Sequence, residues 1–168
     1  MKKWNLKHIV ISALLIAIHV VLSRFCSINA WNIKIGFSFV PVFIAAYLYG
    51  PLFAGLVGGL GDFLGAVLFP IGPYFPGFTL TCFLTGLLFG ILLHKKQSLL
   101  RILCAVLVNQ LILGLFLNTL WISVLYDSPF GALILTRVVQ CLILIPIEFI
   151  VINFLAKAPF LRRKEVLV

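Results

Sequence analysis

Long apolar stretches constrain this chain more than any other feature of its sequence. Six follow one another, at about residues 8–25, 36–49, 52–69, 78–95, 99–125 and 131–156. A helix that crosses a bilayer needs roughly 20 predominantly apolar residues, so six helices would take up about 120 of the 168 positions. The rest suffices for tails and connections but not for a separate soluble domain. The sequence therefore predicts an all-α integral membrane protein, one domain over residues 1–168 with six transmembrane helices.

Composition favours the lipid bilayer as partner and excludes several other classes. The chain is 63% hydrophobic and 10% charged, whereas soluble domains carry about 25% charged residues. A net charge of +9 can indicate nucleic acid, but sixteen phenylalanines and scarce polar residues argue against it. The sequence contains no P-loop motif, no catalytic motif and no metal-ligand spacing. We therefore expect no catalytic residue, no metal site and no cofactor of its own.

The distribution of cations predicts the orientation, because cytoplasmic loops of membrane proteins are enriched in Lys and Arg. With both termini in the cytoplasm, ten of the thirteen cations fall on the cytoplasmic side. These are Lys2, Lys3, Lys7, Lys95, Lys96, Arg101, Lys157, Arg162, Arg163 and Lys164. Arg24, Lys34 and Arg137 remain for the outer half, where they could bind an anionic group.

Small residues four apart recur within the apolar stretches. Three glycine pairs, Gly55/Gly59, Gly61/Gly65 and Gly86/Gly90, and the pair Ala13/Ala17 each lie on one helical face. Such faces allow close approach of backbones. They predict either packing between helices of this chain or a groove for another membrane protein.

Charged residues inside membrane spans are costly and mark functional hypotheses. Asp62 and Glu148 are such carboxylates, and Arg137 lies on one helical face with Gln140 and Glu148. This stripe must face protein or a water-filled cavity. These polar residues could either connect helices of the chain through polar contacts or contact a ligand.

The fifth span carries amides, and an ordered Pro/Gly-rich loop at 69–77 carries aromatic side chains. Asn109 and Asn118 offer donors and acceptors that suit the edge of a planar heterocycle. Trp121 and Phe75 could supply stacking faces, and Tyr74 of the loop can pack into protein. Trp121 is equally suited to the aromatic belt at the membrane interface, and the amides to bonds between helices.

Six apolar spans with the pair Ala13/Ala17 in the first resemble the S components of energy-coupling factor (ECF) transporters. Two segments resemble the folate-specific S components in particular: the stretch from Gly61-Asp62-Phe63-Leu64-Gly65 to Tyr74-Phe75-Pro76-Gly77-Phe78-Thr79, and Asn118-Thr119-Leu120-Trp121. The resemblance covers nearly the whole chain.

The resemblance implies a vitamin-binding subunit of a prokaryotic plasma membrane that captures folate and is not an enzyme. It would work with a transmembrane T subunit, docked at Ala13 and Ala17, and with two cytoplasmic ATPases that bind the ATP. Residues of about 1–69 would face the T subunit, and those of about 70–168 would enclose substrate. The expected binding residues are Arg24, Lys34, Tyr74, Phe75, Asn109, Asn118, Trp121, Arg137 and Gln140.

Other functions are compatible with the same residues. The chain could be an S component for another vitamin. It could also be a small intramembrane enzyme that uses Asp62 and Glu148 as acid and base, or a structural or ion-conducting oligomer.

Overall fold

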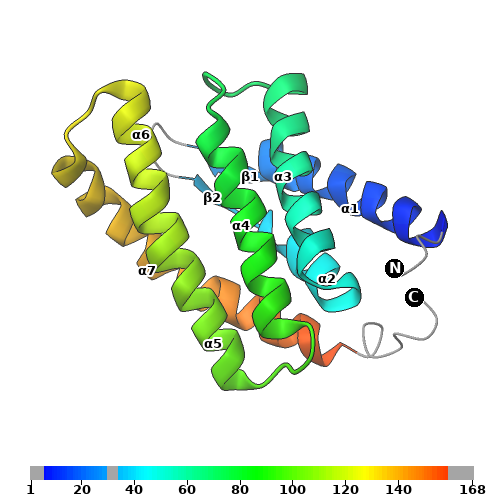
Figure 1. Ribbon diagram of the computed structural model, residues 1–168. Coiled ribbons are helices and arrows are strands. Elements are labelled where there is room, and N and C mark those ends of the chain that lie inside the picture. The colour runs from blue at the N-terminus through cyan, green and yellow to red at the C-terminus, as the bar shows by residue number, and fades with distance from the viewer. Residues whose placement is uncertain (1–5, 30–33, 159–168) are drawn as a thin grey trace.

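The computed structural model describes residues 6–29 and 34–158, which form six helical rods and one small hairpin (Figure 1). The first two rods and the hairpin are α1 (Leu6–Arg24), β1 (Ser27–Asn29), β2 (Lys34–Gly36) and α2 (Phe39–Tyr49). They are followed by α3 (Pro51–Leu68) and α4 (Pro76–Leu93). The fifth rod is continuous through α5 (Leu99–Val108), η1 (Asn109–Leu117) and α6 (Asn118–Tyr126), and the sixth is α7 (Phe130–Lys157).

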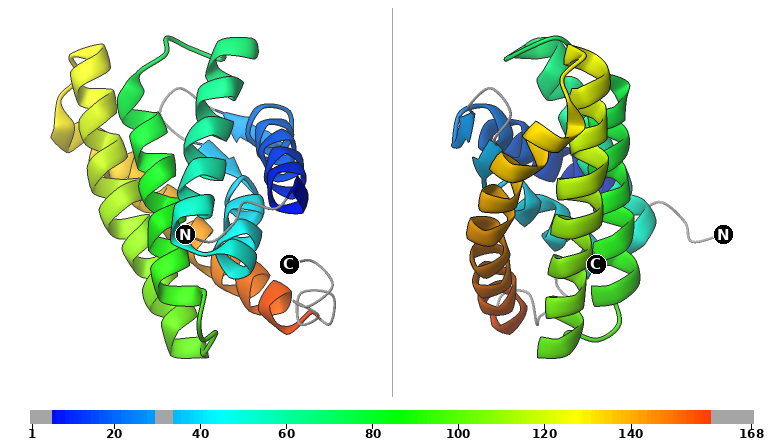
Figure 2. Two further views of the ribbon diagram at one scale, coloured as in Figure 1. Left: turned by 45° about the vertical axis from the view of Figure 1, so that its right-hand side comes forward. Right: turned by 90° about the vertical axis from the view of Figure 1, so that its left-hand side faces the viewer.

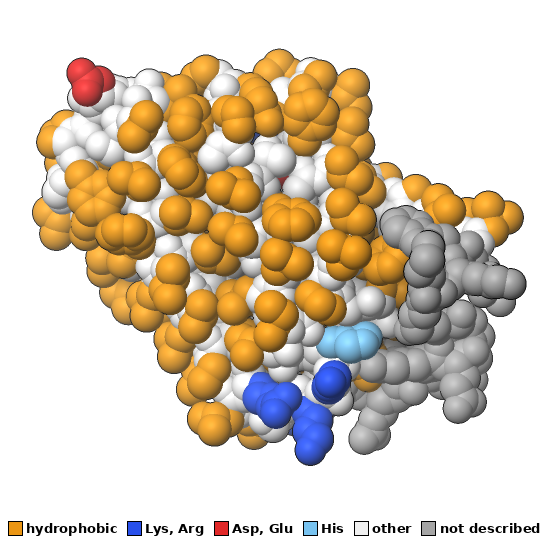
Figure 3. Space-filling view, in the orientation of Figure 1, with side chains coloured by type: hydrophobic (Ala, Val, Ile, Leu, Met, Phe, Trp, Pro, Cys, Tyr) orange, Lys and Arg blue, Asp and Glu red, His pale blue; other side chains and the backbone are white. Residues whose placement is uncertain are grey.

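This architecture confirms an all-helical membrane protein with six helices. Four rods of the described chain are long and apolar enough to cross a membrane: α3, α4, Leu99–Tyr126 and α7. Hydrophobic side chains cover the face formed by α4, α5 and α6 (Figure 3). Such a surface suits lipid rather than water.

The second predicted span is shorter than expected. Helix α2 has 11 residues, which extend over about 16 Å, well short of the roughly 30 Å of a hydrocarbon core. Eight of these residues are buried, because α1, α3, α4 and α7 all contact the helix. Its apolar sequence therefore reflects burial inside protein.

The start of the predicted span belongs to a hairpin that the sequence pattern did not reveal. Strands β1 and β2 pair antiparallel, with Ile28 opposite Ile35. Gly36 lies so close to Ser27 that an added Cβ would be 2.6 Å from the Ser27 Cβ. Three-residue strands are too short to show a period in sequence, which explains why this element was missed.

Glycines bring α3 and α4 into backbone contact. A Cβ on Gly86 would lie 2.2 Å from the Ala54 carbonyl oxygen, and one on Gly58 would lie 2.4 Å from that of Cys82. The predicted pair Gly61/Gly65 faces α1 instead, since Gly61 packs on His19 and Gly65 on Arg24. The glycine pairs therefore serve packing within the chain.

The rods form two groups of helices (Figures 1 and 2). Helices α1, α2, α3 and α4 pack on one another, while α7 packs on α5, η1 and α6. The hydrophobic core surrounds α2, around Phe43, Phe89 and Ile152. The hairpin contacts both α1 and α7 and so lies between the two groups.

Candidate functional site

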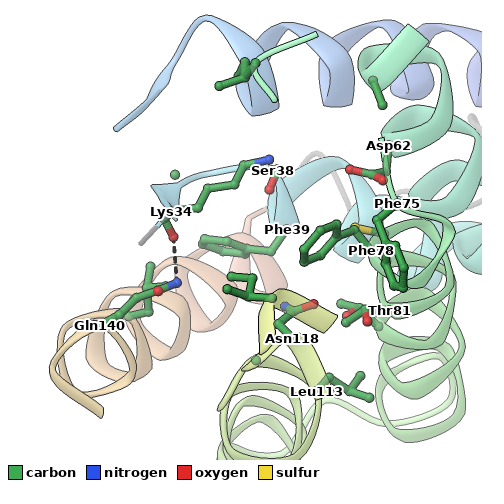
Figure 4. A pocket seen from close by; sticks show the side chains of 18 of the residues that line it. Lys34, Ser38, Phe39, Asp62, Phe75, Phe78, Thr81, Leu113, Asn118 and Gln140 are labelled. Carbon is green, nitrogen blue, oxygen red and sulfur yellow. Dashed lines mark hydrogen bonds between the residues drawn. The ribbon is translucent and has the colours of Figure 1, made fainter. Parts of the chain in front are cut away.

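A cavity of about 570 Å³ lies between the two groups of helices. Its lining comes from α1, β2, α2, α3, the loop before α4, α4, η1, α6 and α7 (Figure 4). Every predicted binding residue except Trp121 lines it: Arg24, Lys34, Tyr74, Phe75, Asn109, Asn118, Arg137 and Gln140. Residues from both predicted halves of the chain therefore enclose one space.

This cavity is lined by all three cations that the sequence assigns to the outer half, Arg24, Lys34 and Arg137. The Arg24 guanidinium lies 3.5 Å from Asp62 Oδ1, and the Lys34 ammonium donates to Ser23 Oγ over 2.9 Å. Burial lowers the pKa of Lys34 in the hairpin below its ordinary value. Arg137 is buried and donates to the Gly114 carbonyl over 2.9 Å. The cavity lining therefore carries these three cations against two carboxylates, Asp62 and Glu148.

Asp62 also lines the cavity and contacts side chains of two other helices. Besides the contact with Arg24, its Oδ2 accepts a hydrogen bond of 2.9 Å from Thr79 Oγ1. The Thr79 hydroxyl also lies 3.4 Å from the Tyr74 hydroxyl. Asp62 therefore fixes Arg24 and links α1 to α4, where Thr79 also reaches Tyr74 of the preceding loop.

Two amide oxygens on the cavity lack partners. The Gln140 amide nitrogen donates to the Lys34 carbonyl over 2.8 Å, and this bond holds the hairpin against α7 (Figure 4). Gln140 Oε1 and Asn118 Oδ1 are buried and find no hydrogen-bond partner within residues 6–29 and 34–158. Buried polar atoms are usually hydrogen-bonded, so these two acceptors are suited to donors of a bound molecule.

A second polar group lies farther along α7. Both carboxylate oxygens of Glu148 accept from Asn109 Nδ2, at 3.0 and 3.3 Å. Asn109 Oδ1 in turn accepts from Thr85 Oγ1 over 2.9 Å. The polar stripe from Arg137 to Glu148 thus faces protein and cavity, as the sequence predicted.

The fifth rod departs from the predicted α-helix at the cavity. Its segment η1 is a π-helix of nine residues. Hydrogen bonds from i to i+5 widen the turn, so a face recurs roughly every four to five residues instead of every 3.6. This keeps Asn109, Gly114 and Asn118 on the cavity. Wide turns of this kind occur often at functional sites. The spacing of residues in the sequence did not predict this π-helix.

Comparisons with known proteins identify the family. The sequence profile described as "ECF transporter, substrate-specific component" matches residues 7–156. The chain belongs to this family. It is 40% identical to the folate transporter FolT of Clostridium novyi over 153 residues, covering 90% of this chain and 88% of the relative. It is 34% identical to the folate transporter FolT of Leuconostoc mesenteroides over 160 residues, covering 91% of this chain and 86% of the relative.

A solved structure agrees with this assignment. The crystal structure of FolT bound with folic acid superposes with a TM-score of 0.87 at 33% identity, covering 91% of this chain and 96% of that chain. The fold of this S component is therefore that of a transporter subunit. An enzyme built on Asp62 and Glu148 does not fit a substrate-specific transporter component, and the two carboxylates have separate partners.

Aromatic side chains complete the cavity of the S component, and here one residue differs from expectation. Phe75 lines the cavity, whereas Trp121 packs beside it with ring centroids 5.6 Å apart. The Trp121 indole donates to Thr81 Oγ1 over 3.1 Å, so the ring bridges α6 and α4. Trp121 therefore packs behind Phe75 instead of lining the cavity.

Several residues that line the cavity were not predicted from the sequence. Phe78 follows Phe75 within the aromatic string and was the easiest to find. Ser38 and Phe39 lie where the hairpin enters α2, inside a stretch read as one uniform span. No cluster of three metal-ligating side chains occurs among the described residues.

Proposed function

We propose that this S component captures folate from outside the cell and delivers it to the cytoplasm with a T subunit and two ATPases. The observation that carries the proposal is the cavity, which combines three cations with amides and aromatic rings. Folate carries two carboxylates at its glutamate end and a flat, hydrogen-bonding pterin at the other. A volume of about 570 Å³ lies within the roughly 300–1,000 Å³ typical of sites for small ligands.

Mass spectrometry tests the ligand directly. The chain is purified in detergent from cells grown with folate, and the small molecule released on denaturation is identified. We expect folate in near-stoichiometric amount and unchanged on prolonged incubation. Another vitamin in its place would overturn the substrate, and a conversion product would overturn a pure binding role.

The proposal includes both termini in the cytoplasm of a prokaryotic cell, with the cavity open toward the outside. Lys95, Lys96 and Arg101 are exposed at the connection of α4 and α5. Lys and Arg side chains gather at the lower end of the face in Figure 3. The terminal cations Lys2, Lys3, Arg162, Arg163 and Lys164 lie outside the described residues. Cysteines placed beside Lys96 and Arg163 should resist impermeant thiol reagents in intact cells, and labelling from outside would overturn the orientation.

Docking of the T subunit is assigned to α1. Ala13 and Ala17 are exposed, and larger exposed side chains such as Val10, Leu14 and Val21 surround them. Two small residues within a bulky face leave a shallow notch into which a second helix can pack closely. This face of α1 is directed away from the cavity, so residues 1–69 can serve docking and binding at once.

Bulky substitution separates docking from binding. Ala13→Trp with Ala17→Trp should abolish uptake in cells that contain the T subunit and ATPases, while folate binding in detergent stays within about twofold. The matched control is Leu135→Trp with Val139→Trp, an exposed i,i+4 pair on α7, which should retain uptake. Uptake that persists without the ATPases would indicate a channel instead.

A further inference from the structure

Positive charge is concentrated at the connection between α4 and α5. Lys95, Lys96 and Arg101 are all exposed there, and none of them lines the cavity. Figure 3 shows Lys and Arg side chains gathered at the lower end of the face, next to hydrophobic side chains. We call these three residues the basic cluster.

No acidic side chain among the described residues balances the basic cluster. Asp62 and Glu148 line the cavity. Asp127 follows the far end of the fifth rod, whose 28 residues begin near the cluster and extend over roughly 40 Å. The ion pair found within the described part of the chain includes Asp62 and no member of the cluster. The charge of the cluster is therefore not neutralised by these residues.

Two neighbouring polar side chains fix the connection itself. Gln97 Nε2 donates to the Leu93 carbonyl over 2.6 Å at the end of α4. Ser98 Oγ accepts from the Arg101 backbone nitrogen over 3.3 Å and caps the start of α5. By contrast, the ammonium and guanidinium groups of the basic cluster make no hydrogen bond or ion pair with residues 6–29 and 34–158. These charged groups are thus available to a partner.

Exposed apolar side chains adjoin the basic cluster. Leu100 and Leu103 are 71% and 37% exposed, and a spacing of three residues puts them on one face of α5. Ile91, near the end of the contacting helix α4, is 68% exposed. Both helices belong to rods long and apolar enough to cross a membrane. Cations at the ends of such helices extend to the level of the lipid headgroups.

A phospholipid with net negative charge matches both parts of this surface. Its headgroup is complementary to the basic cluster, and its acyl chains are complementary to the leucines. Lys and Arg clusters beside a transmembrane helix attract anionic lipids, by roughly fivefold in affinity for each residue. A soluble acidic partner would match the cations but leave the exposed leucines uncovered, and a zwitterionic lipid would match only the leucines.

We propose that the basic cluster, together with Leu100 and Leu103, binds an anionic phospholipid. The headgroup contacts Lys95, Lys96 and Arg101, and an acyl chain lies along α5. Because hydrogen bonds fix the connection at both helix ends, the lipid anchors this end of the fifth rod at the membrane surface. The surface shares no residue with the cavity lining, so the lipid and the cavity ligand bind independently.

A comparison of two lipids with identical acyl chains tests the proposal. Phosphatidylglycerol carries a net negative charge, and phosphatidylcholine carries none. Each is titrated onto the delipidated full-length chain in detergent, and bound lipid is counted by native mass spectrometry. The wild type should bind phosphatidylglycerol at least about tenfold more tightly than phosphatidylcholine. An excess of glycerophosphoglycerol, the headgroup without its chains, should not displace the lipid; displacement would make the surface a site for soluble anions and overturn the proposal.

Removal of the charge should abolish the preference. In Lys95→Gln with Lys96→Gln and Arg101→Gln, the preference for phosphatidylglycerol should shrink to within about threefold. Melting temperature and folate affinity should stay at their wild-type values, because the three side chains are exposed and lie outside the cavity. A preference that persists in this variant would overturn the assignment. If lipid binding persists while co-purification of the partner subunits is lost, the basic cluster is a protein interface instead.

The matched control removes the same charge elsewhere. Arg162→Gln with Arg163→Gln and Lys164→Gln also neutralises three cations, and it should keep the wild-type preference. Equal losses in both triple variants would indicate a general attraction of the positive chain for anionic lipid and refute a defined surface. Leu100→Ser with Leu103→Ser should weaken both lipids to the same extent and leave their ratio unchanged. Undiminished binding of both lipids in that variant would refute the acyl-chain contact.

Discussion

The helices around the cavity pack in two different ways. Helices α3 and α4, here the glycine wall, meet backbone to backbone, as at Gly86 and Ala54. Helices η1, α6 and α7, here the polar wall, meet through side chains, as where Arg137 reaches the Gly114 carbonyl or Glu148 accepts from Asn109. Small residues give close packing in membranes, whereas ionisable residues mark ligand pathways. The glycine wall is thus held together by close backbone packing, and the polar wall by hydrogen bonds of side chains.

The largest effect is expected in the polar wall. Arg137→Ala should cost about 2–5 kcal/mol of folate binding, as for truncating one partner of a buried charged pair. Isothermal titration of the purified protein measures it. Arg137→Lys should recover only part of the loss, because an ammonium cannot form the two-pronged contact of a guanidinium.

The same variant distinguishes a ligand contact from a strut. If Arg137 serves the ligand, the ligand-free Arg137→Ala protein should lose no more stability than the hydrogen bond to the Gly114 carbonyl supplies, about 0.5–1.5 kcal/mol. Normal folate binding combined with a lower melting temperature would make Arg137 structural. The role of binding the glutamate would then pass to Arg24 and Lys34.

The next effect tests the glycine wall. Gly86→Ala places a Cβ against the Ala54 carbonyl, so the two helices must separate. Overpacking of this kind costs about 1–3 kcal/mol of stability. Thermal melting in detergent should show the loss. Gly131→Ala is the matched control, because a Cβ there meets nothing within 4 Å and its melting temperature should not fall. Equal effects at both glycines would contradict the account of this wall.

The sequence predicted the two walls to different extents. Glycine pairs four apart indicated close packing, and Gly86 and Gly90 indeed lie on Ala54 and Pro51. The cations assigned to the outer half all reached the cavity, because charge inside a membrane is too costly to leave in lipid. Spacing on one regular helix also placed Glu148 on the stripe with Arg137.

What the sequence could not show depends on contacts between distant segments. The π-helix in the fifth rod has no marker in composition, so its wider turns were not predicted. The shortness of α2 was hidden because burial in protein and burial in lipid select the same apolar residues. The pairing of Asp62 with Arg24 joins residues 38 apart in sequence, which no local pattern indicates.

A smaller effect is expected where the two walls meet. Trp121 of α6 donates to Thr81 of α4 and packs on Gly77, so it connects the walls behind Phe75. Trp121→Phe removes one hydrogen bond and should lower stability by about 0.5–1.5 kcal/mol, measured by thermal melting. Folate affinity should change less than in Arg137→Ala, since the ring lies beside the cavity lining. A larger loss of affinity than in Arg137→Ala would place the indole on the ligand itself.

The smallest effect concerns Lys34, on the hairpin between the two walls. Because burial lowers the pKa of Lys34 in the folded protein below 10.5, the unfolded chain binds more protons between these two pKa values. Stability must therefore rise with pH through this window. Over the same window the ammonium is lost, so an anionic ligand should bind less tightly. The two trends have opposite signs, which a general effect of alkali would not produce.

Melting curves and folate titrations from neutral pH toward 10.5 measure both trends against Lys34→Met, which lacks the titrating group. Relative to this variant, the ligand-free wild type should gain stability and lose affinity as pH rises. Both changes should be small, because Arg24 and Arg137 stay charged and Ser23 remains a hydrogen-bond partner of the amine. Parallel affinity curves for the two proteins would mean that Lys34 holds the hairpin in place without contacting the ligand. The charge that binds the glutamate would then belong to the polar wall and to Arg24.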